Sequence, residues 1–274
     1  MTDLCIDEGR SADPESSTPV VGTYPFGRPA TRRLPRLPET DSAAVLVLGV
    51  YPSALHVRWA RPGGPPIAAL AVDDEPTVFW TGHNQAERVE WWRRQVGWRP
   101  EWGAISPAGA NGGSGRLVVT DVLEPLGLDP RSAYFTDCLP TYFVKPGERQ
   151  DRAIREYDEF AVAAGLSASV LRRRPDKRDL VRIAVQTEGS ELLRQFRDSA
   201  APTVVTLGKE AADVFAALTG TDRVPFRLTG EYGVSRAVPL GGREIRWIPL
   251  VHPGVRRDIG WRNCHARWVL SQRS

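Results

Sequence analysis

The chain has 274 residues, of which 41% are hydrophobic and 25% are charged, and its formal net charge is +3 at pH 7. This composition is typical of a globular protein and excludes collagen-like, coiled-coil and wholly disordered chains. No stretch of sequence approaches the roughly 18 consecutive apolar residues of a membrane span. The N-terminus also lacks the basic and apolar regions of a signal peptide. We therefore expect a cytoplasmic protein without a membrane partner.

The cysteines and histidines show no metal-binding pattern. Cys5, Cys138 and Cys264 are far apart in the sequence, and no two of them form a C-x-x-C pair. This spacing indicates no disulfide framework, zinc site or iron–sulfur cluster. His265 falls in a predicted helix, where we interpret it as a packed or surface residue. We expect neither a metal nor another cofactor.

Strand-like and helix-like segments alternate along most of the chain. Residues 1–40 are rich in Ser, Thr, Pro, Asp and Arg, and we expect them to form a flexible arm. Short unbroken apolar runs, typical of strands buried on both faces, occupy residues 43–49, 116–122, 133–139, 202–207 and 245–251. Apolar residues at helical spacing occur at residues 83–96, 151–164, 190–199, 209–218 and 261–270.

This alternation predicts an α/β fold for residues 41–274, a three-layer αβα sandwich with a mainly parallel central sheet. Functional residues of such sheets gather at the carboxyl ends of the strands. The first run leads into Gly49-Val50-Tyr51-Pro52-Ser53, the run at 133–139 contains Asp137, and the last leads into His252-Pro253-Gly254. Lys209 opens a helix directly after the run at 202–207, which places a helix N-terminus suited to an anion at the same edge.

The order of these motifs resembles that of the uracil-DNA glycosylase superfamily. Its members share G-x-x-P-[SG] after the first strand, a base-reading polar residue after a middle strand, L-G-[KR]-x-A and a late H-P-[SG]. The corresponding positions here are 49–53, Asp137, 207–211 and 252–254. The resemblance extends from residue 43 to about residue 270. It implies a glycosylase-like fold, a DNA partner and hydrolysis of the N-glycosidic bond of a flipped base.

The resemblance also implies roles for individual residues. The loop that contains Gly49, Val50, Tyr51 and Ser53 would lie beside the sugar, the base and the attacking water. Phe79 would stack on the flipped base, and Asp137 would read it. His252 would stabilise the negative charge that develops on the departing base. The residues implied to contact DNA are Ser53, Thr81, Lys209, Arg256 and Arg257.

Tyr51 is a first departure from the superfamily pattern. Many members have Asp or Asn at this position to hold or activate the water, whereas an unperturbed tyrosine, with a pKa of about 10, is a poor base. Some members lack an acid there and rely on the histidine. Two interpretations of Asp73, Asp74 and Glu75 remain open: one of them supplies the missing carboxylate, or all three form a solvated turn.

Asp137 is a second departure, because uracil-specific members have Asn at this position. An ionised carboxylate offers only acceptors and would repel O4 of uracil. A protonated Asp137 could donate to N3 of cytosine and accept from its N4 amine. We therefore favour a cytosine-type base, a modified one, since excision of ordinary cytosine would damage the genome, while uracil stays open as the other candidate. Alternatively, Asp137 caps the turn that follows the strand.

Basic and aromatic residues are concentrated in a few segments. Residues 243–273 contain seven arginines against Glu244 and Asp258, which suits a phosphate-binding surface. The basic run at 172–182 is either a solvated surface or a second DNA contact. The glycine-rich segment 109–115 is interpreted as a flexible loop. Most of the tryptophans clustered in the first half of the chain are expected in a core or a subunit contact, namely Trp80, Trp91, Trp92, Trp98 and Trp102.

Two other functions stay open on sequence grounds. A non-catalytic member of the same fold would bind nucleic acid or a nucleotide with a steep salt dependence and cleave nothing. A small-molecule enzyme of an unrelated α/β class would show no salt-dependent binding of DNA.

Overall fold

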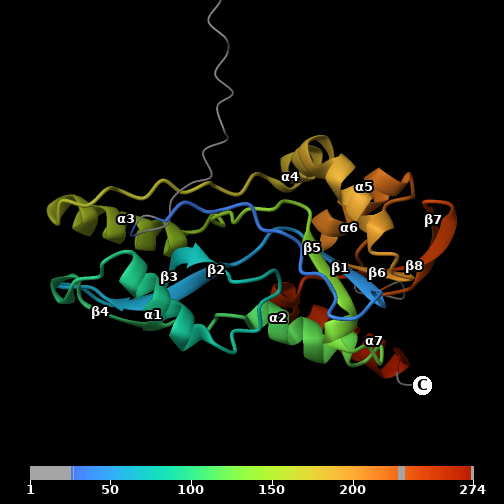
Figure 1. Ribbon diagram of the computed structural model, residues 1–274, viewed down its shortest axis with the longest axis horizontal. Helices are drawn as coiled ribbons and strands as arrows, with labels where there is room; N and C mark the ends of the chain where they lie inside the picture. Colours follow the sequence, from blue (N-terminus) through green and yellow to red (C-terminus); the bar gives the residue numbers. More distant parts are fainter. Residues whose placement is uncertain (1–25, 27, 228–231, 273–274) are drawn as a thin grey trace, which may run out of the picture.

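The computed structural model describes residues 26, 28–227 and 232–272, in which two β-sheets lie side by side (Figure 1). The larger sheet has the strand order β5-β1-β6-β8-β7. Its strands are β1 (Val45–Gly49), β5 (Ala133–Asp137), β6 (Thr203–Leu207), β7 (Arg236–Leu240) and β8 (Arg243–Leu250). All are parallel except β7, which runs antiparallel to β8 at one edge.

Helices cover both faces of this sheet. In Figure 1, α4 (Lys177–Ile183), α5 (Gly189–Asp198) and α6 (Lys209–Thr219) lie above it, and α2 (Gly113–Val118) and α7 (Ile259–Gln272) lie below. Successive side chains of a strand point to opposite faces. Leu46 and Leu48 of β1 therefore enter the core under α4 to α6, while Val45 and Val47 enter the core over α2 and α7. The predicted α/β class with a mainly parallel sheet is confirmed.

The strand predicted at residues 116–122 is wrong. These residues form the end of α2 and a π-helical continuation, Val119–Leu123. Val118 and Val122 are four residues apart, so a helix points both into the core below the sheet. A short apolar run alone does not distinguish such a helix from a buried strand.

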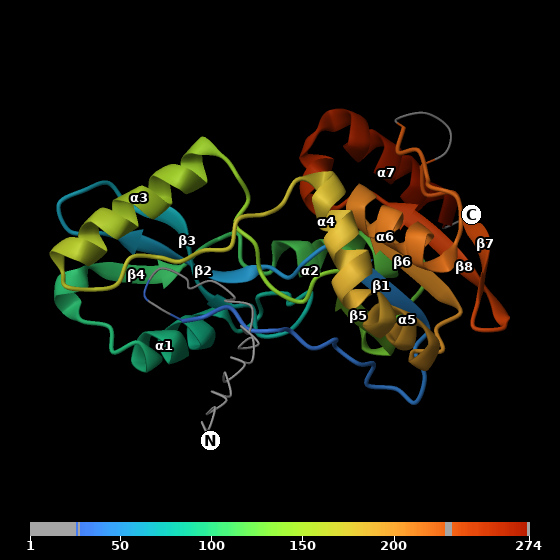
Figure 2. The ribbon, with the colours of Figure 1, turned by 90° about the horizontal axis from the view of Figure 1, so that it is seen from above.

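The smaller sheet was not predicted. It is antiparallel, with the order β3-β2-β4, and contains β2 (Ala54–Ala60), β3 (Ile67–Asp74) and β4 (Ala104–Pro107). Figure 2 shows that α1 (Gln85–Gln95) and α3 (Glu148–Ala163) lie beside this sheet, away from the parallel one. The core between this sheet and the two helices is rich in aromatic rings, including Phe26, Trp59, Trp92, Trp102 and Tyr157. The clustered tryptophans thus serve mainly as core residues.

Residues 28–40, the last part of the segment predicted as a flexible arm, pack on the rest of the protein. We call these residues the strap. Arg36 forms an antiparallel bridge with Phe135 at the edge of β5, and the Glu39 amide donates to the Arg131 carbonyl (2.7 Å). Thr31 donates to Asp74 Oδ2 through its amide (2.7 Å) and its hydroxyl (2.5 Å). The ordered structure therefore begins before residue 41. Residues 1–25 lie outside the described residues.

We expect Thr31→Val to lower the free energy of unfolding by about 1–2 kcal/mol, because it removes a hydrogen bond to a buried carboxylate. Thr40→Val is the matched control, since its hydroxyl bonds only to the exposed Ser42 carbonyl. Urea denaturation measures both. Equal stability of the two variants would contradict the importance of the strap.

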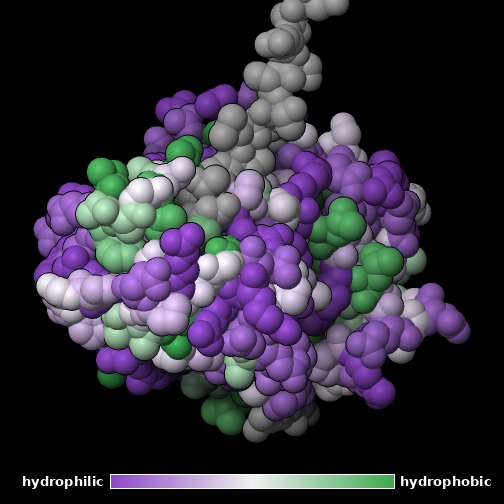
Figure 3. Space-filling view, turned by 60° about the vertical axis from the view of Figure 1, so that its left-hand side comes forward, coloured by the Kyte–Doolittle hydropathy of each residue, from purple (hydrophilic) through white to green (hydrophobic). Residues whose placement is uncertain are grey.

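The surface is mostly hydrophilic on the face that Figure 3 shows, with hydrophobic residues in scattered groups. Within the described ranges, the helices are too short or too polar to cross a membrane.

Candidate functional site

The motifs that follow the parallel strands lie at one edge of the larger sheet. Gly49 of β1 is level with Asp137 of β5, and Leu207 of β6 is level with Leu250 of β8. The Leu48–Thr206 pair joins the two halves in the same register. The loops after β1, β6 and β8 and the end of β5 therefore meet at one edge, as parallel pairing requires.

Gly49, Phe79 and Asp137 are in direct contact at this edge. A Cβ atom built on Gly49 would lie 2.1 Å from Asp137 Oδ1 and 2.9 Å from Phe79 Cζ. A residue larger than glycine would thus displace either the carboxyl group or the ring. The structure brings together three of the residues that the sequence assigned to base recognition.

Phe79 has a strained backbone. Its φ is 55°, in the left-handed region that bulky residues rarely adopt. Helix α2 packs closely against this segment, since a Cβ on Gly115 would lie 2.4 Å from the Phe79 carbonyl oxygen. The glycine-rich segment predicted as a loop is helical from Gly113 on. Gly115, which has no side chain, permits this close packing.

Asp137 is a buried acid. Only 9% of its surface is exposed, and its carboxyl group meets no hydrogen-bond donor among the described residues. Burial, and then the nearby charge of Glu75, raise the pKa of Asp137 well above its usual range. Burial therefore favours the neutral acid over the carboxylate. The side chain faces Gly49 and Phe79, which contradicts the alternative that it caps the following turn.

The acidic triplet before Phe79 is not a solvated turn, because Asp73, Asp74 and Glu75 are all buried. Glu75 Oε1 accepts a hydrogen bond from the Ser53 amide at 3.0 Å. Burial raises the pKa of Glu75 to about 7. Glu75 therefore joins the site, next to the loop after β1. Its position between an apolar strand and Phe79 is the only sequence signal that pointed to it.

Val50 and Tyr51 follow Gly49 and pack into the core under α4 to α6. The Tyr51 ring contacts Phe143 (5.4 Å between centroids) beneath the Arg174 guanidinium. Burial raises the pKa of Tyr51 to about 12, so it is no base near neutral pH. Val50 is buried, 3.5 Å from the position of a Cβ on Gly208.

His252 lies after β8, two strands from β1, which is about 10 Å across the sheet. It is half-buried, and its Nδ1 accepts the Gly254 amide at 3.0 Å. A neutral imidazole with Nδ1 as acceptor carries its proton on Nε2. In this tautomer, Nε2 is the ring nitrogen of His252 that carries the hydrogen.

The residues predicted to contact DNA differ in their surroundings. Ser53 is exposed, and Thr81 Oγ1 lies 3.1 Å from His83 Nδ1. Lys209 forms an ion pair with Asp213 (3.1 Å) and is half exposed. Arg256 lies with Arg257 in a 3-10 turn, Pro253–Arg257, and their side chains are outside the described part of the structure.

The N-terminus of α6 has an internal anion. The Glu210 carboxylate lies in its first turn, pairs with Arg174 at 2.6 Å and has a lowered pKa, to which its own amide and Arg174 contribute against the effect of burial. The predicted anion site is thus partly filled by the protein itself. Other arginines of the basic run also have internal partners: Arg172 lies over Phe143, and Arg173 pairs with Asp151.

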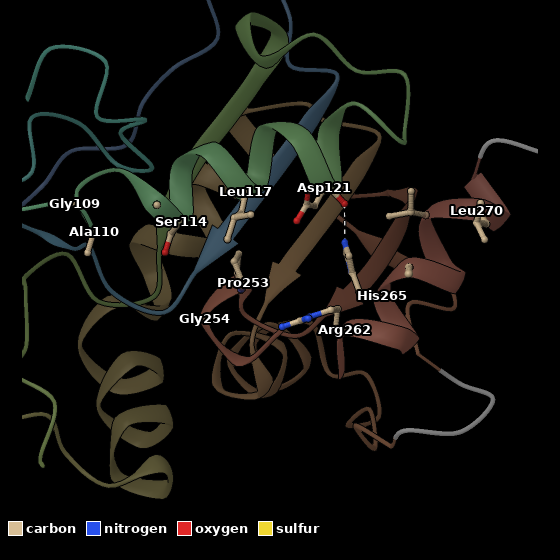
Figure 4. A pocket seen from close by; sticks show the side chains of 13 residues that line it. Gly109, Ala110, Ser114, Leu117, Asp121, Pro253, Gly254, Arg262, His265 and Leu270 are labelled. Carbon is tan, nitrogen blue, oxygen red and sulfur yellow. Dashed lines mark hydrogen bonds between the residues drawn. The ribbon is translucent and has the colours of Figure 1, made fainter. Parts of the chain in front are cut away.

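A cavity of about 840 Å³ lies between α2 and α7, beside Pro253 and Gly254, the two residues that follow His252 (Figure 4). Ser114 and Leu117 line one wall, Arg262 lines the other, and Pro253 and Gly254 adjoin both. His265 is buried there, with its Nε2 2.8 Å from the Asp121 carbonyl oxygen and its Nδ1 2.8 Å from the Tyr232 hydroxyl. The prediction that His265 is a packed residue is confirmed.

In the described part of the chain, no three His, Cys, Asp or Glu side chains are grouped so that they could hold a metal ion. No family model matches the sequence, and no curated protein matches it either.

Proposed function

We propose that the protein is a DNA glycosylase-like hydrolase that cleaves the N-glycosidic bond of a flipped, cytosine-type base. The observation that supports this most is that Phe79 and the buried Asp137 both pack against Gly49 at one strand end, and that Asp137 has no hydrogen-bond partner among the described residues. Phe79 provides an aromatic face for stacking, and Asp137 provides an unused polar group for recognition. His252 follows β8 on the same edge of the sheet, and the proposal assigns it the stabilisation of the departing base.

The protonated form of Asp137, which burial favours, would distinguish between bases. A neutral carboxyl group has one donor and one acceptor, so it fits the edge of cytosine and, with its two oxygens exchanged, that of uracil. Only cytosine has an unprotonated N3 that can take the proton. When Asp137 transfers its proton to N3, the bond between C1′ and N1 breaks and its electron pair stays on the base. Because N3 already carries the added proton, the base departs as a neutral molecule. This step favours cytosine-type substrates over uracil.

Base release from DNA duplexes tests the proposal. Duplexes containing uracil, cytosine or a 5-modified cytosine are incubated with the wild-type protein and with His252→Ala. We expect release of a modified cytosine and a decrease of about 10²–10³-fold in His252→Ala, as for removal of one oxyanion donor. Salt-dependent binding without release from any duplex would instead support a non-catalytic nucleic-acid-binding protein. Absence of DNA binding would favour a small-molecule enzyme.

A further inference from the structure

Hydrolysis at this site would be accelerated by a group that accepts a proton from the attacking water. Tyr51 is the residue after β1 at the position where many members of the superfamily have the acid. Its ring packs against Phe143, and its pKa is raised to about 12. Burial raises the pKa of Asp137 and favours its protonated form. Tyr51 is therefore no base near neutral pH, and burial disfavours the carboxylate form of Asp137. The other buried carboxyl group next to this loop is that of Glu75.

Glu75 lies where such an acceptor is needed. It follows β3 directly, and only 5% of its surface is exposed. Its carboxylate is bound by the amide of Ser53, at the end of the loop after β1, at 3.0 Å. The amide of Phe79 also faces it, and its charge acts on Asp137. Glu75 therefore touches the loop, the segment with the stacking ring and the surroundings of the base-reading acid.

Burial and the surrounding charges together set the pKa of Glu75. Arg33 and Arg36 of the strap are the positive groups near it, and Asp74 and Asp137 are the acidic ones. Burial has the largest effect and raises the pKa of Glu75 to about 7. A general base works best when its pKa is close to the working pH.

We propose that Glu75 is the general base of the reaction, an inference that rests on the proposed glycosylase function. Glu75 takes a proton from water as the water oxygen forms a bond to C1′ of the deoxyribose. The C1′–N1 bond breaks at the same centre, and its electron pair leaves with the base, which Asp137 protonates. The products are a free base and an abasic sugar. Glu75 then releases its proton to solvent and Asp137 takes one up from solvent, which restores both groups.

The test is Glu75→Gln in the full chain, because glutamine keeps an acceptor for the Ser53 amide. We expect single-turnover base release to fall at least about 100-fold, with unchanged affinity for a duplex that carries a non-cleavable 2′-fluoro nucleotide. In the wild type, release should rise as the pH increases through about 7, and this rise should disappear in Glu75→Gln. Asp73→Asn is the matched control, a neighbouring buried acid that pairs with Arg28 at 3.5 Å, and it should keep the wild-type rate and pH profile.

The outcomes separate the two proposals. If the wild type releases no base from any duplex, the glycosylase function itself fails. If the wild type is active and Glu75→Gln keeps its rate and its pH profile, only the role of Glu75 is overturned. Loss of duplex affinity together with the rate in Glu75→Gln would also overturn it, because the acid would then be structural.

Discussion

Asp137→Asn should reverse the base preference of the protein. Asparagine can donate one hydrogen bond and accept another, but it has no proton to give to N3 of cytosine. We expect release of the modified cytosine to fall by about 10²–10⁴-fold, the usual contribution of a general acid. Release of uracil should be retained or increase, since the amide matches O4 and N3–H. Single-turnover assays on the two duplexes measure the ratio.

Asp213→Asn is a suitable control for this prediction. Asp213 is also a buried acid, but it lies on α6 and pairs with Lys209 away from Gly49 and Phe79. Its substitution should leave the preference unchanged. A parallel decrease on both duplexes in Asp137→Asn would show that Asp137 supports the structure and does not select the base.

Gly49→Ala should inactivate the site without unfolding the protein. The added methyl group would lie 2.1 Å from Asp137 Oδ1 and 2.9 Å from Phe79 Cζ, so the acid or the ring must move. A displacement of about 1 Å in a catalytic site can decrease the rate by about 100-fold. We expect a loss of at least this size in base release.

Gly113→Ala provides the comparison, because a Cβ at Gly113 has no neighbour within 4 Å and φ there is not positive. Its rate of base release should stay within about twofold of the wild type, in line with the small effects of unstrained surface substitutions. Thermal melting of both variants shows whether they fold. Full activity of Gly49→Ala would contradict the assignment of the site to Gly49, Phe79 and Asp137.

The sequence predicted the parallel sheet well where burial on both faces leaves a clear pattern. Val45–Gly49 is such a run, and it forms β1. The run at 116–122 has a similar composition but becomes a helix, because packing below the sheet decides between the two forms. The antiparallel sheet also had a signal that was missed, the alternation of Leu55, Val57 and Trp59 before a turn rich in Pro and Gly.

The strand-end residues of the site were predicted from sequence, and Glu75 was left undecided. Gly49 and Asp137 follow apolar runs whose parallel pairing makes their meeting predictable. The triplet that ends in Glu75 looks solvated in the sequence, and its burial depends on distant residues. Thr31 covers Asp74 from 43 positions away, and Arg33 of the same strap lies near Glu75. Local patterns contain no information about such contacts.

The central claim is that this strand edge binds a flipped base and releases it by hydrolysis. Mass spectrometry of the products from a duplex with one 5-modified cytosine tests it most directly. The predicted result is free modified base in amounts equal to the abasic sites formed in the same strand. An intact strand, from a wild-type protein that binds the duplex, would contradict the claim.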